Sequence, residues 1–145
     1  MGILSKRCEY GLRAVLFLVA QRERRPYIAI REISDALDVS FHFLTKILQA
    51  LTEGGFLTSY RGPSGGVALA REAHEITVLD LVECLEGPDL FRSCVLGLDG
   101  CGSRKPCPLH AEWTVQRKAL RDMFSRTSLD ALGKKTAADG LRLTQ

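Results

Sequence analysis

The chain contains no long apolar run, no Cys-x-x-Cys pair and no large net charge, and each absence disfavours a class of protein. Its most apolar stretch, residues 12–20, is too short to span a bilayer and is interrupted by Arg13. A highly charged segment, residues 21–25, follows it, where a secretory signal would carry small residues for cleavage. Because neither a Cys-x-x-Cys pair nor a catalytic motif is present, an oxidoreductase is disfavoured. We therefore expect a cytoplasmic protein that is not an enzyme and has no membrane partner.

The formal net charge is only +3, but the charges are unevenly distributed along the chain. Residues 1–71 carry ten Lys and Arg against six Asp and Glu, whereas residues 72–145 carry ten against eleven. The basic excess therefore lies in the N-terminal half, where it favours a polyanionic partner such as double-stranded DNA. A solvated basic face without a partner is the simpler alternative.

The composition indicates one ordinary domain, or one domain with an extension. Apolar residues make up 46% of the 145 residues, which is enough for a core. The five cysteines cannot all pair within one chain. Without a convincing export signal, this odd number favours a reduced compartment over a disulfide framework.

The first half of the sequence predicts three helices, of which the second and third form a helix-turn-helix. The first covers roughly residues 6–23, and the second is short and amphipathic. Ser40 is a good N-cap for the third, and Gly54 and Gly55 end it. Four apolar residues of the third helix form its expected inward stripe, namely Leu44, Ile47, Leu48 and Leu51. The third helix of such a motif enters the major groove by its N-terminal end, so Ser40, His42, Thr45 and Lys46 are the predicted DNA contacts. A solvated helix face is the alternative.

A β-hairpin is predicted directly after these helices. Residues 56–60 and 67–69 alternate as short strands do, and a glycine-rich tip, Arg-Gly-Pro-Ser-Gly-Gly, lies between them. This is the pattern of a wing, in which Arg61 suits a narrow minor groove. Gly62, Ser64 and Gly65 make the tip slim enough to approach DNA closely. Alternatively, the glycines serve only the geometry of the turn.

The second half predicts a helix from about residue 76 to 86, with Thr77 as its cap, and a long amphipathic helix from Pro108 to about Ser128. The long helix packs either on a partner subunit or back onto the first helix, and the two-fold dimers typical of helix-turn-helix proteins favour the partner. The expected fold is mainly α with a small β-hairpin wing. We divide it into a winged helix-turn-helix domain at 1–87, a cluster-binding loop and dimerisation helix at 88–128, and a flexible tail at 129–145 that has little to bury and is either loose or weakly helical.

Three cysteines and a histidine fall in one loop between these helices. The spacing Cys-x6-Cys-x5-Cys-x2-His joins Cys94, Cys101, Cys107 and His110, and glycines and prolines interrupt the segment. Thiolates suit zinc or an iron–sulfur cluster, although the spacing is not one of the usual zinc patterns. A thiol switch that forms a disulfide between Cys94 and either other cysteine is a further alternative. The simplest alternative is a coincidence of free cysteines.

Five segments together resemble the Rrf2 family of transcriptional regulators, including its iron–sulfur regulators. They are KRCEYGLRAV, VSFHFLTKIL, RGPSGGVALA, ITVLDLVECLEG and CPLHAEW, and the resemblance extends from residue 1 to about 128. It implies a winged helix-turn-helix homodimer with cross-packed C-terminal helices. It further implies that Cys94, Cys101 and Cys107 ligate a [2Fe-2S] or [4Fe-4S] cluster. His42, Thr45 and Lys46 match base-contacting positions, and Arg61 matches the wing arginine.

The resemblance leaves three candidates for the fourth ligand of the cluster. His110 follows the third cysteine by the spacing found in one branch of the family, and we favour it. Other members use a carboxylate near the N-terminus of the partner subunit, where this chain has Glu9, and Cys8 stands beside it. The first gap has six residues where that branch has five, and the recognition residues also differ in type. Neither the loop geometry nor the operator is therefore transferable.

The expected function is an iron–sulfur cluster-dependent, DNA-binding transcriptional regulator that senses redox state, nitric oxide or iron–sulfur status. The dimer and its wings would adopt more than one arrangement, and the bound cluster would favour one of them. The operator would bind one arrangement more tightly than the others. The alternatives are a zinc-stabilised adaptor that binds protein or RNA and a thiol-redox regulator without an iron–sulfur cluster.

Overall fold

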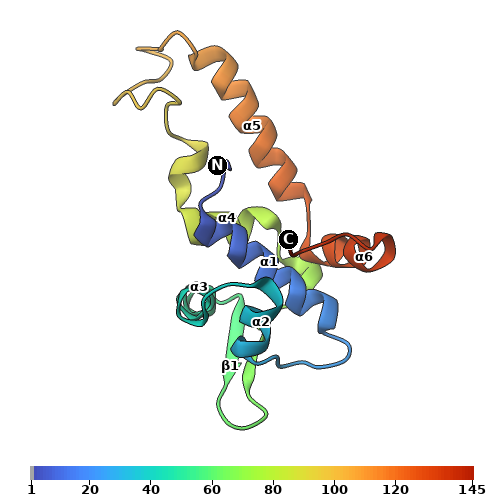
Figure 1. Ribbon diagram of the computed structural model, residues 1–145. Helices are drawn as coiled ribbons and strands as arrows, with labels where there is room; N and C mark the ends of the chain where they lie inside the picture. The colour runs from blue at the N-terminus through green and yellow to red at the C-terminus, as the bar shows by residue number, and fades with distance from the viewer. Residues whose placement is uncertain (1) are drawn as a thin grey trace.

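The computed structural model describes residues 2–145 and confirms a mainly helical chain with one small hairpin. Figure 1 shows the arrangement, with the wing at one end of the molecule and the cysteine loop at the other. In chain order the elements are α1 (Lys6–Gln21), α2 (Ile30–Leu37), α3 (Phe41–Glu53), β1 (Leu57–Tyr60), β2 (Gly66–Leu69), the 3-10 turn η1 (Ala73–Glu75), α4 (Val78–Glu86), η2 (Pro88–Phe91), α5 (His110–Arg126) and α6 (Leu129–Asp139).

Helix α1 lies at the centre of the fold and contacts α2, α3, α4 and α6. Ser5 caps it by accepting a hydrogen bond from the Cys8 N–H, and the Ser5 N–H donates to Glu86 on α4 at 2.7 Å. Gly11 lies where α1 meets α4: a Cβ at this position would be 2.5 Å from a methyl of Leu85. The absence of a side chain at Gly11 therefore sets how closely the two helices approach.

The helix-turn-helix has the predicted form. Asp38 ends α2 with a left-handed backbone (φ 51°), which turns the chain sharply before Ser40 caps α3. The Ser40 hydroxyl accepts from the Phe43 N–H at 3.4 Å. The four apolar residues expected to face inward on α3 are all buried, namely Leu44, Ile47, Leu48 and Leu51.

The wing is the expected antiparallel hairpin, with Leu57 opposite Leu69 and Tyr60 opposite Gly66. One feature was not predicted. Ile28, in the connection before α2, pairs with Val67 through two backbone hydrogen bonds of 3.0 and 2.9 Å. This bridge attaches β2 to the start of the helix-turn-helix, so the position of the wing is fixed relative to α2.

The structure differs from the expectation of a flexible tail after residue 128. Ser128 caps α6 by accepting from the Ala131 N–H at 3.1 Å, and the Leu129 side chain is fully buried. Gly133 lies so close to α1 that a Cβ would be 2.4 Å from a methyl of Val19. Asp130 pairs at 2.5 Å with Arg22, the C-cap of α1. The buried Leu129 side chain and the close contact of Gly133 with α1 therefore hold α6 against the core, although the composition of this segment predicts little burial.

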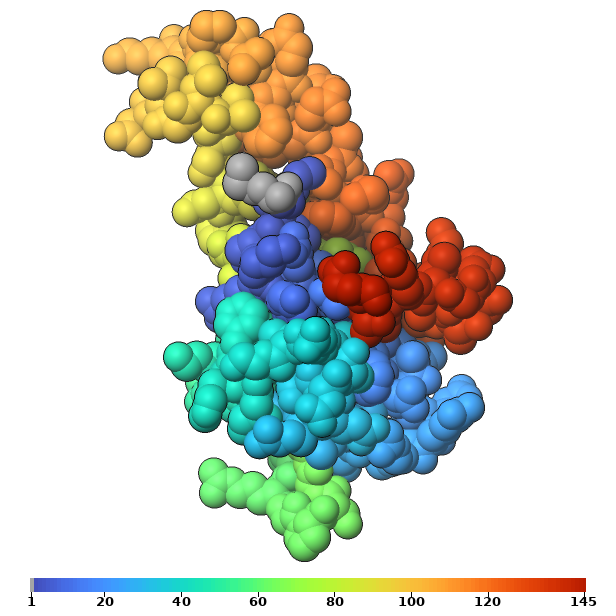
Figure 2. Space-filling view, in the orientation of Figure 1, coloured from blue at the N-terminus to red at the C-terminus, as the bar shows by residue number. Residues whose placement is uncertain are grey.

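Helix α5 begins at His110 rather than at Pro108 and has no buried residue. Its far end is held by backbone pairing: the Val78 N–H donates to Thr127 and the Leu129 N–H to Ile76, both at 2.9 Å. The loop and the first turns of α5 project from the body of the protein (Figure 2). Across the described residues, no helix has both the length and the apolar character needed to cross a bilayer.

Replacing Leu129 by Ala should lower the free energy of unfolding by about 2–5 kcal/mol, because the substitution leaves a cavity between α6 and the core. Urea denaturation at a fixed protein concentration measures the change. Leu141→Ala is the control, because that side chain is 48% exposed and its loss should cost less than about 0.5 kcal/mol. Equal, small effects of the two substitutions would show that α6 does not contribute to the core.

Candidate metal centre and nucleic-acid interface

The cysteine loop brings three sulfur atoms together at the start of α5. The Sγ atoms of Cys94, Cys101 and Cys107 all lie within 4.8 Å of one another. Cys94 and Cys107 are 3.7 Å apart, and the Cys101 sulfur lies 3.6 Å from Nδ1 of His110. The four donor atoms therefore form two close pairs. All three cysteines are half-buried free thiols.

Tight turns and two side chains from α5 hold the loop in this shape. Gly97 and Gly100 both adopt φ of +70°, a conformation that glycine takes without strain. The Trp113 indole N–H donates to the Ser93 carbonyl at 2.9 Å. Arg117 donates to the carbonyls of Arg92 and Ser93 at 2.7 and 3.0 Å. The loop is thus fastened to the helix that carries His110.

Proximity changes how readily these thiols ionise. Hydrogen bonds from the backbone N–H groups of Leu98 and Leu96 lower the pKa of Cys94 to about 7, against the opposing effect of desolvation. At Cys101, the Cys107 N–H, 3.4 Å from the sulfur, favours the thiolate. Desolvation and the neighbouring sulfurs outweigh it and raise the pKa of Cys101. Negative charges on neighbouring sulfurs repel one another, and a cation bound among the sulfurs would offset that repulsion.

The three candidates for a fourth ligand lie in different surroundings. His110, the first residue of α5, is beside Cys101. Cys8 is fully buried in α1, and this burial, together with the Glu86 carboxylate, raises the pKa of its thiol to about 12. Glu9 pairs with Lys6 at 2.8 Å. Within residues 2–145 of one protomer, neither Cys8 nor Glu9 belongs to the group of sulfurs.

The donor set fits a soft or borderline metal. Three sulfurs and one imidazole nitrogen suit an iron–sulfur cluster or a tetrahedral zinc ion, and the four side chains approach without any hard oxygen ligand among them. The same short distance between Cys94 and Cys107 also permits a disulfide after a small movement, since bonded sulfurs are about 2.05 Å apart.

The predicted DNA contacts lie on α3 and the wing, far from the loop in Figure 1. His42, Lys46 and Ser40 are exposed at the N-terminal half of α3. Thr45 is half-buried and its hydroxyl donates to the Phe41 carbonyl at 2.7 Å, which leaves the oxygen free to accept and the methyl group free for apolar contact. These positions match the end of a recognition helix that enters a major groove.

The wing tip places one cation on a slim backbone. Arg61, Gly62 and Ser64 are exposed, and Gly65 is half-buried. The Gly65 N–H closes the tip by donating to the Gly62 carbonyl at 3.0 Å. A Cβ at Gly65 would be 2.2 Å from the Tyr60 carbonyl oxygen, so this position requires glycine for steric reasons. At Gly65, glycine thus has a demonstrated role in the geometry of the turn.

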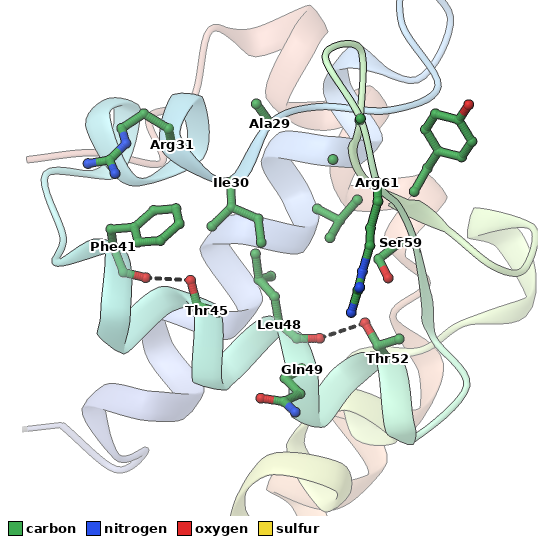
Figure 3. A pocket seen from close by; sticks show the side chains of 15 residues that line it. Ala29, Ile30, Arg31, Phe41, Thr45, Leu48, Gln49, Thr52, Ser59 and Arg61 are labelled. Carbon is green, nitrogen blue, oxygen red and sulfur yellow. Dashed lines mark hydrogen bonds between the residues drawn. The ribbon is translucent and has the colours of Figure 1, made fainter.

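A hollow of about 640 Å³ separates α3 from the wing. Figure 3 shows Ile30 and Leu48 at its floor, Phe41 and Arg31 at one edge and Arg61 at the other. The hollow is also lined by Arg31, Phe41 and Gln49, for which the sequence predicts no function. Their helical periodicity indicates only an outward face. No sequence signal showed that the face borders a hollow rather than open solvent.

Comparison with known proteins identifies the family. A model described as an iron-dependent transcriptional regulator, Rrf2, matches residues 4–135. This chain belongs to the Rrf2 family. As an Rrf2 chain it is a transcriptional regulator, and Rrf2 transcriptional regulators bind DNA. The resemblance noted in the sequence is therefore confirmed.

Individual Rrf2 relatives cover most of the chain. Protein aau3 of Rhizobium meliloti is 38% identical over 83% of this chain and 76% of its own. The regulator IscR of Photorhabdus laumondii is 26% identical over 89% of this chain and 77% of its own. Among solved structures, CymR, the global cysteine regulator of B. subtilis, superposes with a TM-score of 0.78 at 27% identity, over 94% of this chain and 99% of that one. The winged-helix fold is thus shared with these relatives.

Replacing Gly65 by Ala should destabilise the wing, because the new methyl group would collide with the Tyr60 carbonyl. We expect the free energy of unfolding to fall by about 1–3 kcal/mol in urea titrations. Gly102→Ala is the matched control, since a Cβ there meets nothing within 4 Å. Similar values for both variants would contradict the steric role assigned to Gly65.

Proposed function

We propose that this Rrf2 protein is an iron–sulfur cluster-dependent DNA-binding transcriptional regulator that acts as a homodimer. The convergence of three cysteine sulfurs within 4.8 Å of one another, beside His110, carries the proposal. The same chain holds a helix-turn-helix and a wing with an unobstructed arginine. Redox change, nitric oxide and iron–sulfur supply are the classes of signal that such a centre answers.

Cys94, Cys107, Cys101 and His110 are the residues we propose as ligands. The donors form one sulfur pair, Cys94 with Cys107, and one mixed pair, Cys101 with His110. Four donors are the number that a [2Fe-2S] cluster would take from the protein. When bound, such a cluster supplies one-electron redox chemistry and sensitivity to oxidants. The half-buried position of the sulfurs leaves a path for small reactive molecules.

The chain offers a continuous path from the loop to the DNA-binding elements. At its N-terminal side the loop follows η2 and α4, and α4 packs on α1 and α3. At its C-terminal side Trp113 and Arg117 fasten it to α5. A cluster bound in the loop would favour one arrangement of α5 over another. Its effect on DNA affinity would be limited by the difference in its own affinity for the two arrangements.

Helix α5 is the proposed dimer contact. Ala111, Val115, Ala119 and Met123 recur every four residues and are all exposed in the protomer, so they form an apolar stripe along one side of the helix. Leu120 and Phe124 on the other side pack against the core. A second copy of α5 would cover the stripe, as the two-fold symmetry of most helix-turn-helix operators requires.

Replacing Val115, which is 63% exposed, by Glu should weaken the dimer by about a hundredfold, because a charge would be buried without a partner. Light scattering after size exclusion, over a dilution series, measures the dissociation constant. Gln116→Glu adds the same charge about 100° around the helix and should leave the dimer intact. A dimer unaffected by the Val115 substitution would mean that another surface joins the subunits.

Replacing Cys101 by Ala should abolish cluster binding in protein purified without oxygen. We expect the wild type to hold about two irons and two sulfides per subunit with visible absorbance, and the variant to hold close to none. Cys84→Ala is the matched control, because Cys84 is a half-buried free cysteine on α4 whose sulfur faces the Ala50 carbonyl at 3.8 Å. Colourless wild-type protein without iron would contradict the proposed function.

The same measurement separates the alternatives for the fourth ligand and the metal. His110→Ala should lower iron content or shift the spectrum more than Glu9→Ala, because His110 already lies beside Cys101. The opposite ranking would transfer the role to the partner's Glu9. Zinc without iron or sulfide would support a zinc-stabilised protein instead.

A thiol-redox regulator is the second candidate, and the 3.7 Å separation of the Cys94 and Cys107 sulfurs favours it. Hydrogen peroxide would accept two electrons and two protons from these thiols, which gives one disulfide and two waters. Iron-free protein that forms this disulfide under peroxide, and changes its DNA affinity when it does, would support this candidate over the first.

A further inference from the structure

Arg31 lies over an aromatic ring at the edge of the recognition surface. Its guanidinium carbon is 4.3 Å from the centroid of the Phe41 ring, a cation–π contact between the start of α2 and the first residue of α3. Arg31 is exposed, and Phe41 is half-buried. The ring therefore holds a guanidinium in a defined place on a surface that is otherwise open to solvent (Figure 3).

The acidic residue next to this arginine in the sequence is already paired with another arginine. Glu32, its neighbour in sequence, is held by Arg25, whose two terminal nitrogens both donate to it, one at 3.0 Å. Among residues 2–145, no ion pair of Arg31 is found within 4.0 Å. A charge fixed by stacking but not neutralised is available for an external anion, because stacking occupies the face of the guanidinium and leaves its N–H edge free.

The hollow beside Arg31 has the chemistry of a seat for one sugar–phosphate strand. Its floor is apolar, with Ile30, Leu48 and Val67, which suits deoxyribose. Arg31 and Arg61 stand at opposite edges, and no Asp or Glu lines it. A backbone that passes from the major groove at α3 to the minor groove at the wing would cross this space.

We propose that Arg31, positioned by the Phe41 ring, binds a DNA phosphate across the hollow from Arg61, so that the two arginines hold one strand between them. This inference rests on the proposed DNA-binding function and deepens it. Arg31 lies on the first helix of the helix-turn-helix, the one that crosses the backbone in such complexes, so its partner is a phosphate rather than a base. It therefore adds affinity and sets the register without reading sequence.

The experiment measures binding of full-length protein to a fluorescein-labelled, mixed-sequence 30-base-pair duplex by anisotropy over a range of KCl concentrations. Arg31→Gln should weaken binding by roughly tenfold per subunit, as the loss of a charge-assisted contact predicts. It should also reduce the slope of log affinity against log salt by about 0.9 per subunit, because one fewer counterion is released. Arg61→Ala is the positive comparison.

Arg71→Gln is the matched control. Arg71 also lies over a phenylalanine, 5.7 Å from the Phe56 centroid, but it does not line the hollow. The substitution removes the same charge from the same kind of contact. Because Arg71 lies outside the hollow, its loss should leave the salt slope of DNA binding nearly unchanged. A loss of slope equal to that of Arg31→Gln would mean that net charge alone acts, and would overturn the proposal.

The role of Phe41 has its own test. Phe41→Leu should weaken binding less than Arg31→Gln, because the charge remains but its position is lost, and the double variant should bind no more weakly than Arg31→Gln alone. Additive losses would overturn positioning through the ring. Circular dichroism checks that α3 remains folded in Phe41→Leu. If that variant unfolds, Arg31→Lys replaces it in the test, because lysine keeps the charge without the planar stack. Arg31→Lys should keep the salt slope.

The outcomes separate this inference from the function on which it rests. If the wild type binds no duplex with or without the cluster, the DNA-binding function fails and the role of Arg31 fails with it. If Arg61→Ala weakens binding while Arg31→Gln keeps the full salt slope, only the inference is overturned. If Arg31→Gln changes discrimination between sequences but not the slope, Arg31 reads a base and the phosphate assignment is wrong.

Discussion

The close packing of α1 against its neighbours is the constraint on which the rest of the structure depends. Gly11 and Gly133 let α4 and α6 approach this helix to distances that any side chain would prevent. On its other sides α1 meets α2 and α3. One central helix therefore sets the positions of α2 and α3 relative to α4 and α6, the helices next to α5. A change in how α4 or α6 sits on α1 would reach α2 and α3 directly.

The cysteine loop depends on a different kind of order. It has almost no apolar burial, since Val95, Leu96 and Leu98 are all about half exposed. Turns, carbonyl acceptors and sulfur contacts shape it instead. Such a segment gains little free energy from water exclusion, so ligand bonds are the strongest interactions available to it. The loop is consequently the part of the chain whose order is most sensitive to what it binds.

The sequence was a good guide where local chemistry decides structure. The Ser40 and Thr77 caps, the inward stripe of α3 and the glycine-rich tip all act over three or four residues, and their elements form as expected. The family resemblance also allowed the fold to be predicted. The predicted ligands Cys94, Cys101 and Cys107 lie together. The spacing of the cysteines did not predict that the sulfur of Cys101, rather than another, lies beside His110.

The features that were missed depend on contacts between distant parts of the chain. Helix α6 is held by Leu129 and by the contact of Gly133 with Val19, more than a hundred residues apart. The bridge between Ile28 and Val67 joins a connection to a strand, and neither partner has a local signal for it. Arg31 meets Phe41 only because Asp38 turns α2 back toward α3. Patterns within one helix cannot report such meetings.

The fastening of the loop to α5 has an evolutionary consequence. Trp113 and Arg117 grip the carbonyl oxygens of residues 92 and 93, which every amino acid supplies, rather than particular side chains. Substitutions at residues 92 and 93 therefore keep both carbonyl acceptors in place. The attachment of the loop to α5 can accordingly persist while the side chains at residues 92 and 93 change during evolution.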